Sequence, residues 1–287
     1  MEPLPLNTRR FYAKLFFVLF VLILPIVALY ASGYRFEGVG IVSTGGIFVA
    51  TPVSGFSIAI NGEELERSSL FTKSFFFDNL APDSYVVQAE AVGYYPWSKT
   101  LTVEPRLVTD VSVLAVEQPL LVREVLVATS STQGATSTIR LMSRDERNAL
   151  SLAFSATSSP ITSTTTEGIV VTLLDESRGI QLTLNEGDLS LYYNRNDAPP
   201  SSFCVRPSSC VKEFSLERSS ETVNDAQFFA GGVLYSTKES GVYFVEADIR
   251  SPRLTIPVFT TPRARFTFLN NELFIESNKV FYEVVGF

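Results

Sequence analysis

The longest uncharged stretch of the chain lies near its start. From Leu15 to Tyr34 the residues are mainly Leu, Phe, Val and Ile, and none of them carries a charge. As a helix rising about 1.5 Å per residue, this stretch spans about 30 Å, which is the thickness of a bilayer's hydrocarbon core. The pattern therefore predicts a transmembrane helix over 15–34, with Pro25 tolerated as a kink, after a tail formed by residues 1–14.

The charges beside this stretch predict its orientation. Arg9, Arg10 and Lys14 precede it, whereas only Arg35 follows closely. By the positive-inside rule, the tail is cytoplasmic and the body of the chain is extracytoplasmic. The alternatives are a cleaved signal peptide, whose apolar region is shorter and ends at small residues, unlike Leu29, and a buried core helix, for which the pattern predicts no helical partner. We therefore expect a single-pass anchor in the cell membrane, with the lipid bilayer as its partner.

Short alternating runs separated by turn signals follow over 45–116. Phe56, Ile58 and Ile60 alternate with smaller residues, which is typical of a half-buried strand. Asn61-Gly62 then supplies the two positive φ angles of a tight hairpin turn. Similar runs predict a small β-sandwich, with further strands at 46–51, 75–77, 85–91, 97–103 and 108–115.

Five short motifs follow one another in this segment: Gly46-Ile47-Phe48-Val49, Thr51-Pro52-Val53-Ser54-Gly55, Asn61-Gly62, Leu80-Ala81-Pro82-Asp83-Ser84-Tyr85 and Gly93-Tyr94-Tyr95-Pro96-Trp97. Their order resembles that of the PEGA domain family. Two features depart from the family: Asp83-Ser84 replaces a usual glycine, and 63–71 is more charged and lacks the common Thr-Pro. The resemblance implies a small sandwich exposed at a bacterial or archaeal envelope. It supplies no catalytic residues.

Repeated strand pairs characterise the remainder, 118–287. Four segments share an alternating strand, a short turn and a second apolar strand, and their starts are 41, 46 and 38 residues apart. This period is typical of four-stranded propeller blades. A twisted sandwich without closure is the alternative. The four segments are 139–154, 180–193, 226–236 and 264–275.

Further strands are expected around these segments. Residues 242–246 and 280–284 predict further strands of two repeats, and 203–205, 211–214 and 254–259 predict outer strands. The segment 122–128 precedes the repeats and is expected to complete the last blade. The order of anchor, PEGA-like domain and propeller-like repeats is similar to that of membrane-anchored proteins of candidate-phyla bacteria. The overall expectation is an all-β protein with one N-terminal transmembrane helix.

Composition and charge restrict the function. Hydrophobic residues make up 46% of the chain and aromatic residues 12%, enough to fill a core. Net charge is −7; three cations and one acid give the first fourteen residues +2, so the remainder carries −9. This acidic body has no basic stripe for nucleic acid. The chain has no histidine, which removes the commonest general base and metal ligand. We therefore expect no enzyme activity, no cofactor and no metal.

Two sets of residues are candidate sites. Cys204 and Cys210 are expected to form a disulfide outside the cytoplasm, and two cysteines without histidine make a zinc site a poor alternative. Tyr94, Tyr95 and Trp97 form an aromatic cluster that could serve as a ligand platform for glycans, although such clusters more often pack across a sheet corner.

Three functions fit these observations. The first is non-catalytic binding or scaffolding at the cell envelope, with an envelope protein or glycan as partner. The second is a carboxylate-dependent hydrolase acting on cell-surface glycans, which needs two acids about 5–10 Å apart in a cleft; its candidates are Asp145-Glu146, Asp175-Glu176 and 186–188. The third is a signalling ectodomain that depends on a membrane partner, because the predicted tail has no output domain.

Overall fold

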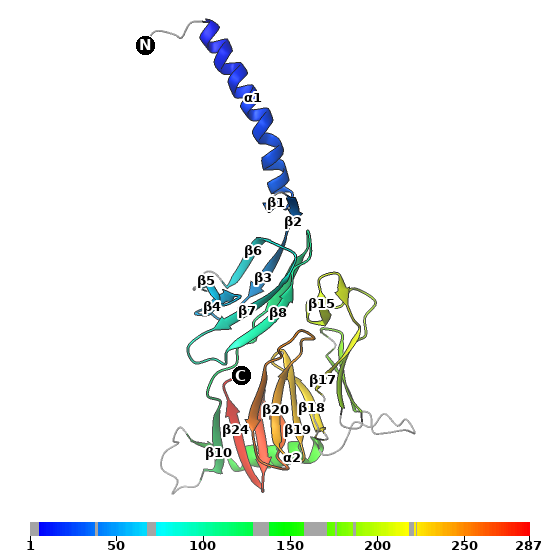
Figure 1. Ribbon diagram of the computed structural model, residues 1–287. Coiled ribbons are helices and arrows are strands. Elements are labelled where there is room, and N and C mark those ends of the chain that lie inside the picture. The colour runs from blue at the N-terminus through cyan, green and yellow to red at the C-terminus, as the bar shows by residue number, and fades with distance from the viewer. Residues whose placement is uncertain are drawn as a thin grey trace.

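The computed structural model describes residues 6–37, 40–67, 73–128, 138–157, 171–175, 177–185, 188–217, 221 and 223–287. These residues form one N-terminal apolar helix and a body made mostly of β-strands in several sheets. Figure 1 shows helix α1 projecting away from the body, with strands β1 and β2 between them. The predicted fold class, all-β with one N-terminal apolar helix, is therefore confirmed.

Helix α1 (Leu6–Ala31) contains the predicted apolar stretch. Within the described residues, it is the one helix that is long and apolar enough to cross a membrane, and no part of its apolar window is buried against the protein. The helix begins earlier than residue 15 and ends before Tyr34. It ends because Gly33 adopts a φ of 78°, a conformation that a helix cannot continue. Pro25 lies inside the helix as predicted.

A short neck connects α1 to the sandwich. Strand β1 (Tyr34–Glu37) pairs with β2 (Gly40–Ser43) in antiparallel orientation. Thr44 closes this hairpin, because its backbone N–H and its hydroxyl both donate to the carbonyl of Gly33, at 2.7 and 2.9 Å. Asn79 of the sandwich donates from Nδ2 to the hydroxyl of Tyr30, at 3.1 Å. We call Tyr30, Gly33, β1, β2 and Thr44 the neck.

The sandwich consists of a three-stranded sheet, β6-β3-β9, and a four-stranded sheet, β5-β4-β7-β8. Every strand predicted over 45–116 is present, and Asn61 and Gly62 adopt the expected positive φ angles of 51° and 83°. The alternating residues Ile47, Ile58 and Val87 are fully buried between the two sheets. The strands are β3 (Gly45–Ala50), β4 (Ser57–Ile60), β5 (Glu63–Arg67), β6 (Ser74–Leu80), β7 (Ser84–Glu90), β8 (Trp97–Thr102) and β9 (Val108–Ser112).

Three sheets in a row form the second part of the body. One apolar core lies between the first and second sheets and another between the second and third. The first sheet contains β12 (Val171–Asp175), β13 (Ile180–Asn185), β14 (Asp188–Tyr193) and β17 (Glu213–Glu217). The second contains β18 (Val223–Phe229), β19 (Gly232–Thr237), β20 (Gly241–Glu246) and β21 (Thr255–Phe259). The third contains β22 (Arg265–Leu269), β23 (Glu272–Ser277), β24 (Val280–Val285), β10 (Leu121–Val127) and β11 (Ile139–Met142).

The third sheet joins the two ends of the repeat region, as predicted for 122–128. Strand β10 pairs antiparallel with β24, with Val122 opposite Val284. The hairpins β13–β14, β18–β19 and β22–β23 match three of the four predicted repeats. Strands β17 and β21 end the first and second sheets. Strand β21 confirms the predicted outer strand at 254–259, whereas β17 begins only at Glu213, near the end of the predicted 211–214.

The fourth predicted repeat, 139–154, is wrong. Only β11 is a strand there, and helix α2 (Arg144–Thr157) follows it. Ser143 and Glu146 start this helix as a capping box: the hydroxyl of Ser143 accepts from the N–H of Glu146 at 3.1 Å, and the carboxylate of Glu146 accepts from the N–H of Ser143 at 2.8 Å. Leu150 and Phe154, one helical turn apart, bury themselves against the third sheet. The described residues thus form three sheets ended by a helix, and not four blades.

Candidate functional site

The sandwich and the three sheets meet at a buried pair of charges. Lys99 of β8 is completely buried, and its Nζ lies 2.7 Å from Oε2 of Glu246 at the end of β20. The same ammonium donates to the carbonyl oxygens of Arg250 and Pro252, each at 3.0 Å. Its three N–H donors therefore all have acceptors, which is what burial of an ammonium group requires.

The second carboxylate oxygen of Glu246 accepts a hydrogen bond from Trp97. Nε1 of Trp97 donates to Oε1 of Glu246 at 3.0 Å, and the backbone N–H of Leu254 donates to Oε2 at 3.1 Å. Trp97 is the one tryptophan of the chain, and it is 1% exposed. Its emission should therefore report on this contact.

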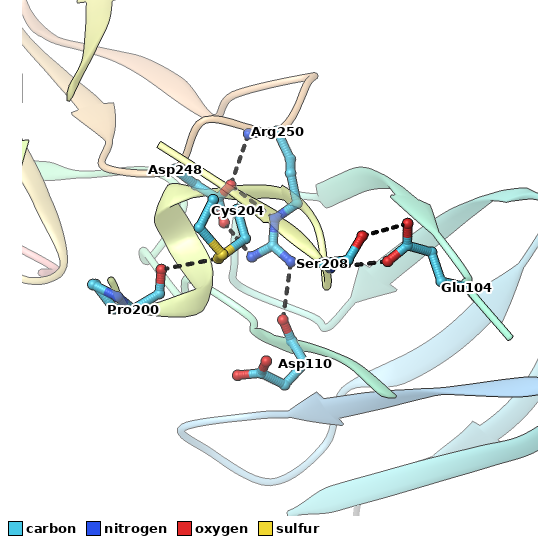
Figure 2. The surroundings of a disulfide bond; sticks show 8 residues. Glu104, Asp110, Pro200, Cys204, Ser208, Asp248 and Arg250 are labelled. Atoms are coloured by element: carbon cyan, nitrogen blue, oxygen red, sulfur yellow. Dashed lines mark hydrogen bonds and ion pairs between the residues drawn. A yellow bond between two sulfur atoms is a disulfide. The ribbon is translucent and has the colours of Figure 1, made fainter. Parts of the chain in front are cut away.

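A second buried ion pair lies nearby in the loop between β20 and β21. Arg250 donates from Nε and Nη2 to the carboxylate of Asp248, at 2.9 and 2.6 Å, and from Nη1 to the carbonyl of Asp110 in β9, at 2.9 Å (Figure 2). The backbone N–H of Thr100 in β8 donates to the carbonyl of Ser251 at 2.8 Å. Strands β8 and β9 are edge strands of the two sandwich sheets. The loop therefore covers both open edges, which would otherwise be free to pair with other strands.

We call the residues that make these contacts the junction: Trp97, Lys99, Glu246, Asp248 and Arg250. The hydrogen bonds that Trp97 and Lys99 make to Glu246 and Arg250 join residues 147 to 151 positions apart in the sequence. The two cores also meet here, since Leu114 and Leu254 pack against both the sandwich core and the core between the second and third sheets.

The cysteine pair lies beside the junction. Cys204 and Cys210 lie at disulfide distance, with their sulfur atoms 1.98 Å apart. They begin and end a small hairpin formed by β15 (Cys204–Arg206) and β16 (Ser209–Cys210), after the short helix η1 (Ser201–Phe203). The predicted outer strand at 203–205 therefore belongs to this separate hairpin and not to a larger sheet.

The hairpin touches the sandwich through one carboxylate. The backbone N–H and the hydroxyl of Ser208 donate to Glu104, at 2.9 and 2.7 Å (Figure 2). These two hydrogen bonds hold the pKa of Glu104 below its usual value. The contact is exposed to solvent, in contrast to the junction.

A cleft of about 880 Å³ opens between the sandwich and the first two sheets. Clefts at domain interfaces are common ligand sites. Its wall includes hydroxyl groups, aromatic rings and charged groups. The residues that line it include 112–115, Asp175, Ser177, Arg178, Tyr193, 200–202, 228–232 and 246–248.

The carboxylates of this cleft are already held by other groups. Asp175 accepts a hydrogen bond from the hydroxyl of Ser177 at 2.6 Å, which lowers its pKa. Glu246 and Asp248 are paired with Lys99 and Arg250. Among the described residues, no three His, Cys, Asp or Glu side chains gather closely enough to hold a metal ion.

The other carboxylate candidates lie apart from the cleft lining. Asp145 and Glu146 belong to the first turn of α2, and Asp188 begins β14. Glu176 and Glu186 lie outside the described residues. Sequence reasoning missed Asp225 in β18, whose pKa is raised to about 6 by burial. Asp225 does not line the cleft.

The three aromatic candidates do not share an exposed surface. Trp97 is buried in the sandwich core and hydrogen-bonded to Glu246, so the prediction of a ligand platform is wrong for this residue. Tyr94 packs on Phe56 in the same core, with ring centroids 5.4 Å apart. Tyr95 packs against the core between the second and third sheets. The cluster thus contributes to the two cores where they meet.

Comparisons with known proteins identify no family. No family model matches the chain, and no curated protein matches it. Among solved structures, one similar chain is a protein of unknown function from Bacteroides fragilis whose membrane association is itself only proposed. It is 11% identical, with 84% of this chain and 94% of that chain covered and a TM-score of 0.21. A TM-score this low supports no conclusion about the present chain.

Proposed function

We propose that this chain is a single-pass membrane protein that holds a non-catalytic β body outside the cytoplasm, for binding or scaffolding at the cell envelope. The observation that carries the proposal is helix α1, whose apolar side chains have no protein surface to bury them in the described structure. Such a surface is unfavourable in water and favourable in lipid. The basic residues Arg9, Arg10 and Lys14 at the start of the helix favour a cytoplasmic N-terminus.

The organisation of the body supports a scaffolding role. The junction joins the sandwich to the sheets through buried, fully paired charges, so the two parts are held together as one body. The cysteine pair is consistent with an oxidising compartment. We infer that a partner, either an envelope protein or a glycan, binds in the cleft beside the junction, because it is a concave surface lined by both aromatic and polar groups.

We also propose that residues 45–116 form a PEGA-like domain. The support is the order of the strands together with two of the motif turns. Asn61-Gly62 forms the expected hairpin turn between β4 and β5. The segment Leu80–Ser84 connects β6 to β7, where the family pattern has its Leu-x-Pro turn.

Hydrolysis of glycans is the weaker proposal. A glycosidase general acid needs a carboxyl group whose pKa is raised, so that it keeps its proton near neutral pH. Asp175 in the cleft has a lowered pKa, and Glu246 and Asp248 accept bonds from buried cations. We therefore expect no reducing sugar to be released from envelope glycans. Release that disappears in Asp175→Asn would favour the hydrolase instead.

Cysteine accessibility tests the membrane topology. The described structure contains no free cysteine, so single cysteines can be introduced and labelled selectively. Thr8→Cys places a thiol at the start of α1, and Glu239→Cys places one on an exposed turn of the second sheet. With a membrane-impermeant maleimide and intact cells, we expect labelling of Glu239→Cys only. Thr8→Cys should react after the membrane is permeabilised.

The opposite labelling pattern would overturn the orientation. Release of both variants from the membrane fraction by alkaline carbonate would overturn the anchor itself. A mature chain that starts near Ser32 would show that α1 is a cleaved signal peptide.

A further inference from the structure

Exposed apolar side chains gather at the neck and at the end of the sandwich that adjoins it. Ile41 of β2 is 53% exposed. Leu107, just before β9, is 40% exposed, and Val108, the first residue of β9, is 48% exposed. The three residues lie on neighbouring segments. Strand β2 continues through Thr44 into β3, and β3 pairs with β9. Isolated exposed apolar residues need no explanation, but a group at one end of a domain indicates a contact.

Hydrogen bonds place this group beside the end of α1. The carbonyl of Thr44 accepts from the N–H of Arg106 at 2.7 Å, and the N–H of Thr44 donates to Gly33 at 2.7 Å. Gly33 is the second residue after the helix. The N–H of Gly46 donates to the carbonyl of Leu107 at 3.1 Å, which fixes the same turn to β3.

These contacts set the depth of the turn relative to a bilayer. If the hydrocarbon core covers the uncharged stretch 15–34, Gly33 lies at its boundary. The head-group layer beyond that boundary is about 5–8 Å thick. Chain segments joined by one backbone hydrogen bond lie about 5 Å apart, so the two bonds from Gly33 through Thr44 keep Arg106 and Leu107 within about 10 Å. The turn 104–108 therefore lies in or against the head-group layer.

Two arginines at this end of the sandwich suit the phosphate of lipid head groups. Arg35 in β1 and Arg106 in the turn add positive charge to a body that is otherwise strongly acidic. Two of the acids near this end are engaged: Glu104 accepts from Ser208, and Asp83 accepts from the N–H of Ser84 at 2.7 Å. A third acid, Glu37, ends β1. Arginine beside apolar residues is typical of segments that lie at a membrane surface.

The backbone does not explain why an arginine occupies this position. Arg106 adopts a φ of 62°, a conformation that favours glycine over a residue with a Cβ. The side chain is exposed, so it is available to solvent or lipid.

We propose that the turn 104–108 is a second membrane contact, in which Leu107 and Val108 enter the outer head-group layer and Arg106 binds lipid phosphate. This inference rests on the proposed function, because it requires α1 to span the bilayer. The contact would hold the sandwich at a fixed inclination to the membrane and direct the three sheets away from it.

Tryptophan quenching in lipid tests the contact. The full-length Leu107→Trp variant is reconstituted into phosphatidylcholine vesicles whose acyl chains carry bromine close to the head group. Val92→Trp is the matched control, because Val92 is fully exposed in the same domain but at its other end, where the carbonyl of the adjacent Gly93 accepts from Gln118. The buried Trp97 contributes the same background to both variants and is subtracted with the parent protein.

The expected result is quenching of about half of the added emission in Leu107→Trp and no quenching in Val92→Trp, because only the turn would lie close to the brominated part of the lipid. Arg106→Trp supplies a second reporter at the same turn. If the protein floats with the vesicles and neither turn variant is quenched, the second contact is overturned while the anchor stands. If the protein does not float with the vesicles, the proposed anchor itself fails.

Discussion

The neck connects helix α1 to the sandwich, and the junction connects the sandwich to the three sheets. The two connections are made by different interactions. The junction buries its charges: Lys99 is completely enclosed and bonded to Glu246 and to two carbonyl oxygens. The neck relies on a short hairpin and on hydrogen bonds near the surface, such as that between Asn79 and Tyr30. Water competes with exposed hydrogen bonds, whereas a buried charge that loses its partner has no replacement.

The difference shows how stability is distributed along the chain. The sandwich and the three sheets are expected to unfold as one unit, because separating them would expose a buried ion pair and two joined cores. Helix α1 is expected to depend on the membrane and to add little to the stability of the body. The following changes test this contrast, beginning with the largest expected effect.

Lys99→Met should destabilise the junction most. It leaves the carboxylate of Glu246 buried beside an apolar side chain, and loss of one member of a buried ion pair costs about 3–5 kcal/mol. Urea unfolding of the detergent-solubilised full-length protein, followed by Trp97 emission, measures the change in the free energy of unfolding.

The double variant Lys99→Met/Glu246→Gln is the control for that prediction. Glutamine removes the charge and keeps an oxygen for Nε1 of Trp97, so most of the lost stability should return. A loss below about 1 kcal/mol in the single variant would mean that the junction is not a stabilising contact.

Asp225→Asn should stabilise the protein at neutral pH. Burial raises the pKa of Asp225 from 3.8 to about 6, so the folded protein holds this proton more tightly than the unfolded chain does. The group therefore stabilises the fold at low pH, and its contribution is lost as the pH rises from about 4 to about 6. Above pH 6 asparagine should be more stable by about 2–3 kcal/mol.

The two proteins should be equally stable near pH 4, as measured by thermal unfolding across this pH range. An advantage of asparagine that did not change with pH would show that the charge of Asp225 is not the cause. The comparison separates this charge, whose pKa is governed by burial, from the paired charges of the junction.

Cys204→Ser/Cys210→Ser should have an intermediate effect. The pair closes a small loop, for which the chain-entropy model gives about 2 kcal/mol. The loss should be confined to the hairpin and its contact with Glu104, so hydrogen exchange should increase at 204–210 and change little at the junction. Faster exchange in β8 and β20 as well would show that the hairpin supports the junction.

Tyr30→Phe should have the smallest effect. It removes the hydroxyl that accepts from Asn79 at the neck, and an exposed hydrogen bond of this kind contributes less than about 0.5 kcal/mol. The midpoint of urea unfolding should stay within error of the parent protein. A shift comparable with that of Lys99→Met would mean that the neck and the junction are equally important to the body.

Local patterns predicted much of the fold. Alternation placed Ile47, Ile58 and Val87 in the sandwich core, since side chains on a strand point alternately to its two faces. The strands that join the ends of the third sheet were also recognisable as apolar runs. Helix α2, where a strand pair was predicted, also has a local signature. Ser143 and Glu146 form a capping box, and Leu150 and Phe154 have helical spacing.

The site was much less predictable. Lys99 stands at an alternating, inward position of its strand, but the sequence does not show that a lysine there is paired with a glutamate 147 residues later. For Trp97 the pattern favoured packing in a core over a surface platform, but it did not specify that the ring donates a hydrogen bond to Glu246. The cleft is formed by segments from both parts of the body and has no signature in any one of them.

The sequence by itself determined the apolar helix, the strands of the sandwich, three of the four repeats and the candidate cysteine pair, because these depend on residues close together in the chain. Tertiary structure alone decided that Lys99 and Glu246 meet, that the loop after β20 covers two sheet edges, and that a cleft opens between the two parts. The physical reason is that a buried charge is stable only when a partner reaches it, and that partner can come from any distance along the chain.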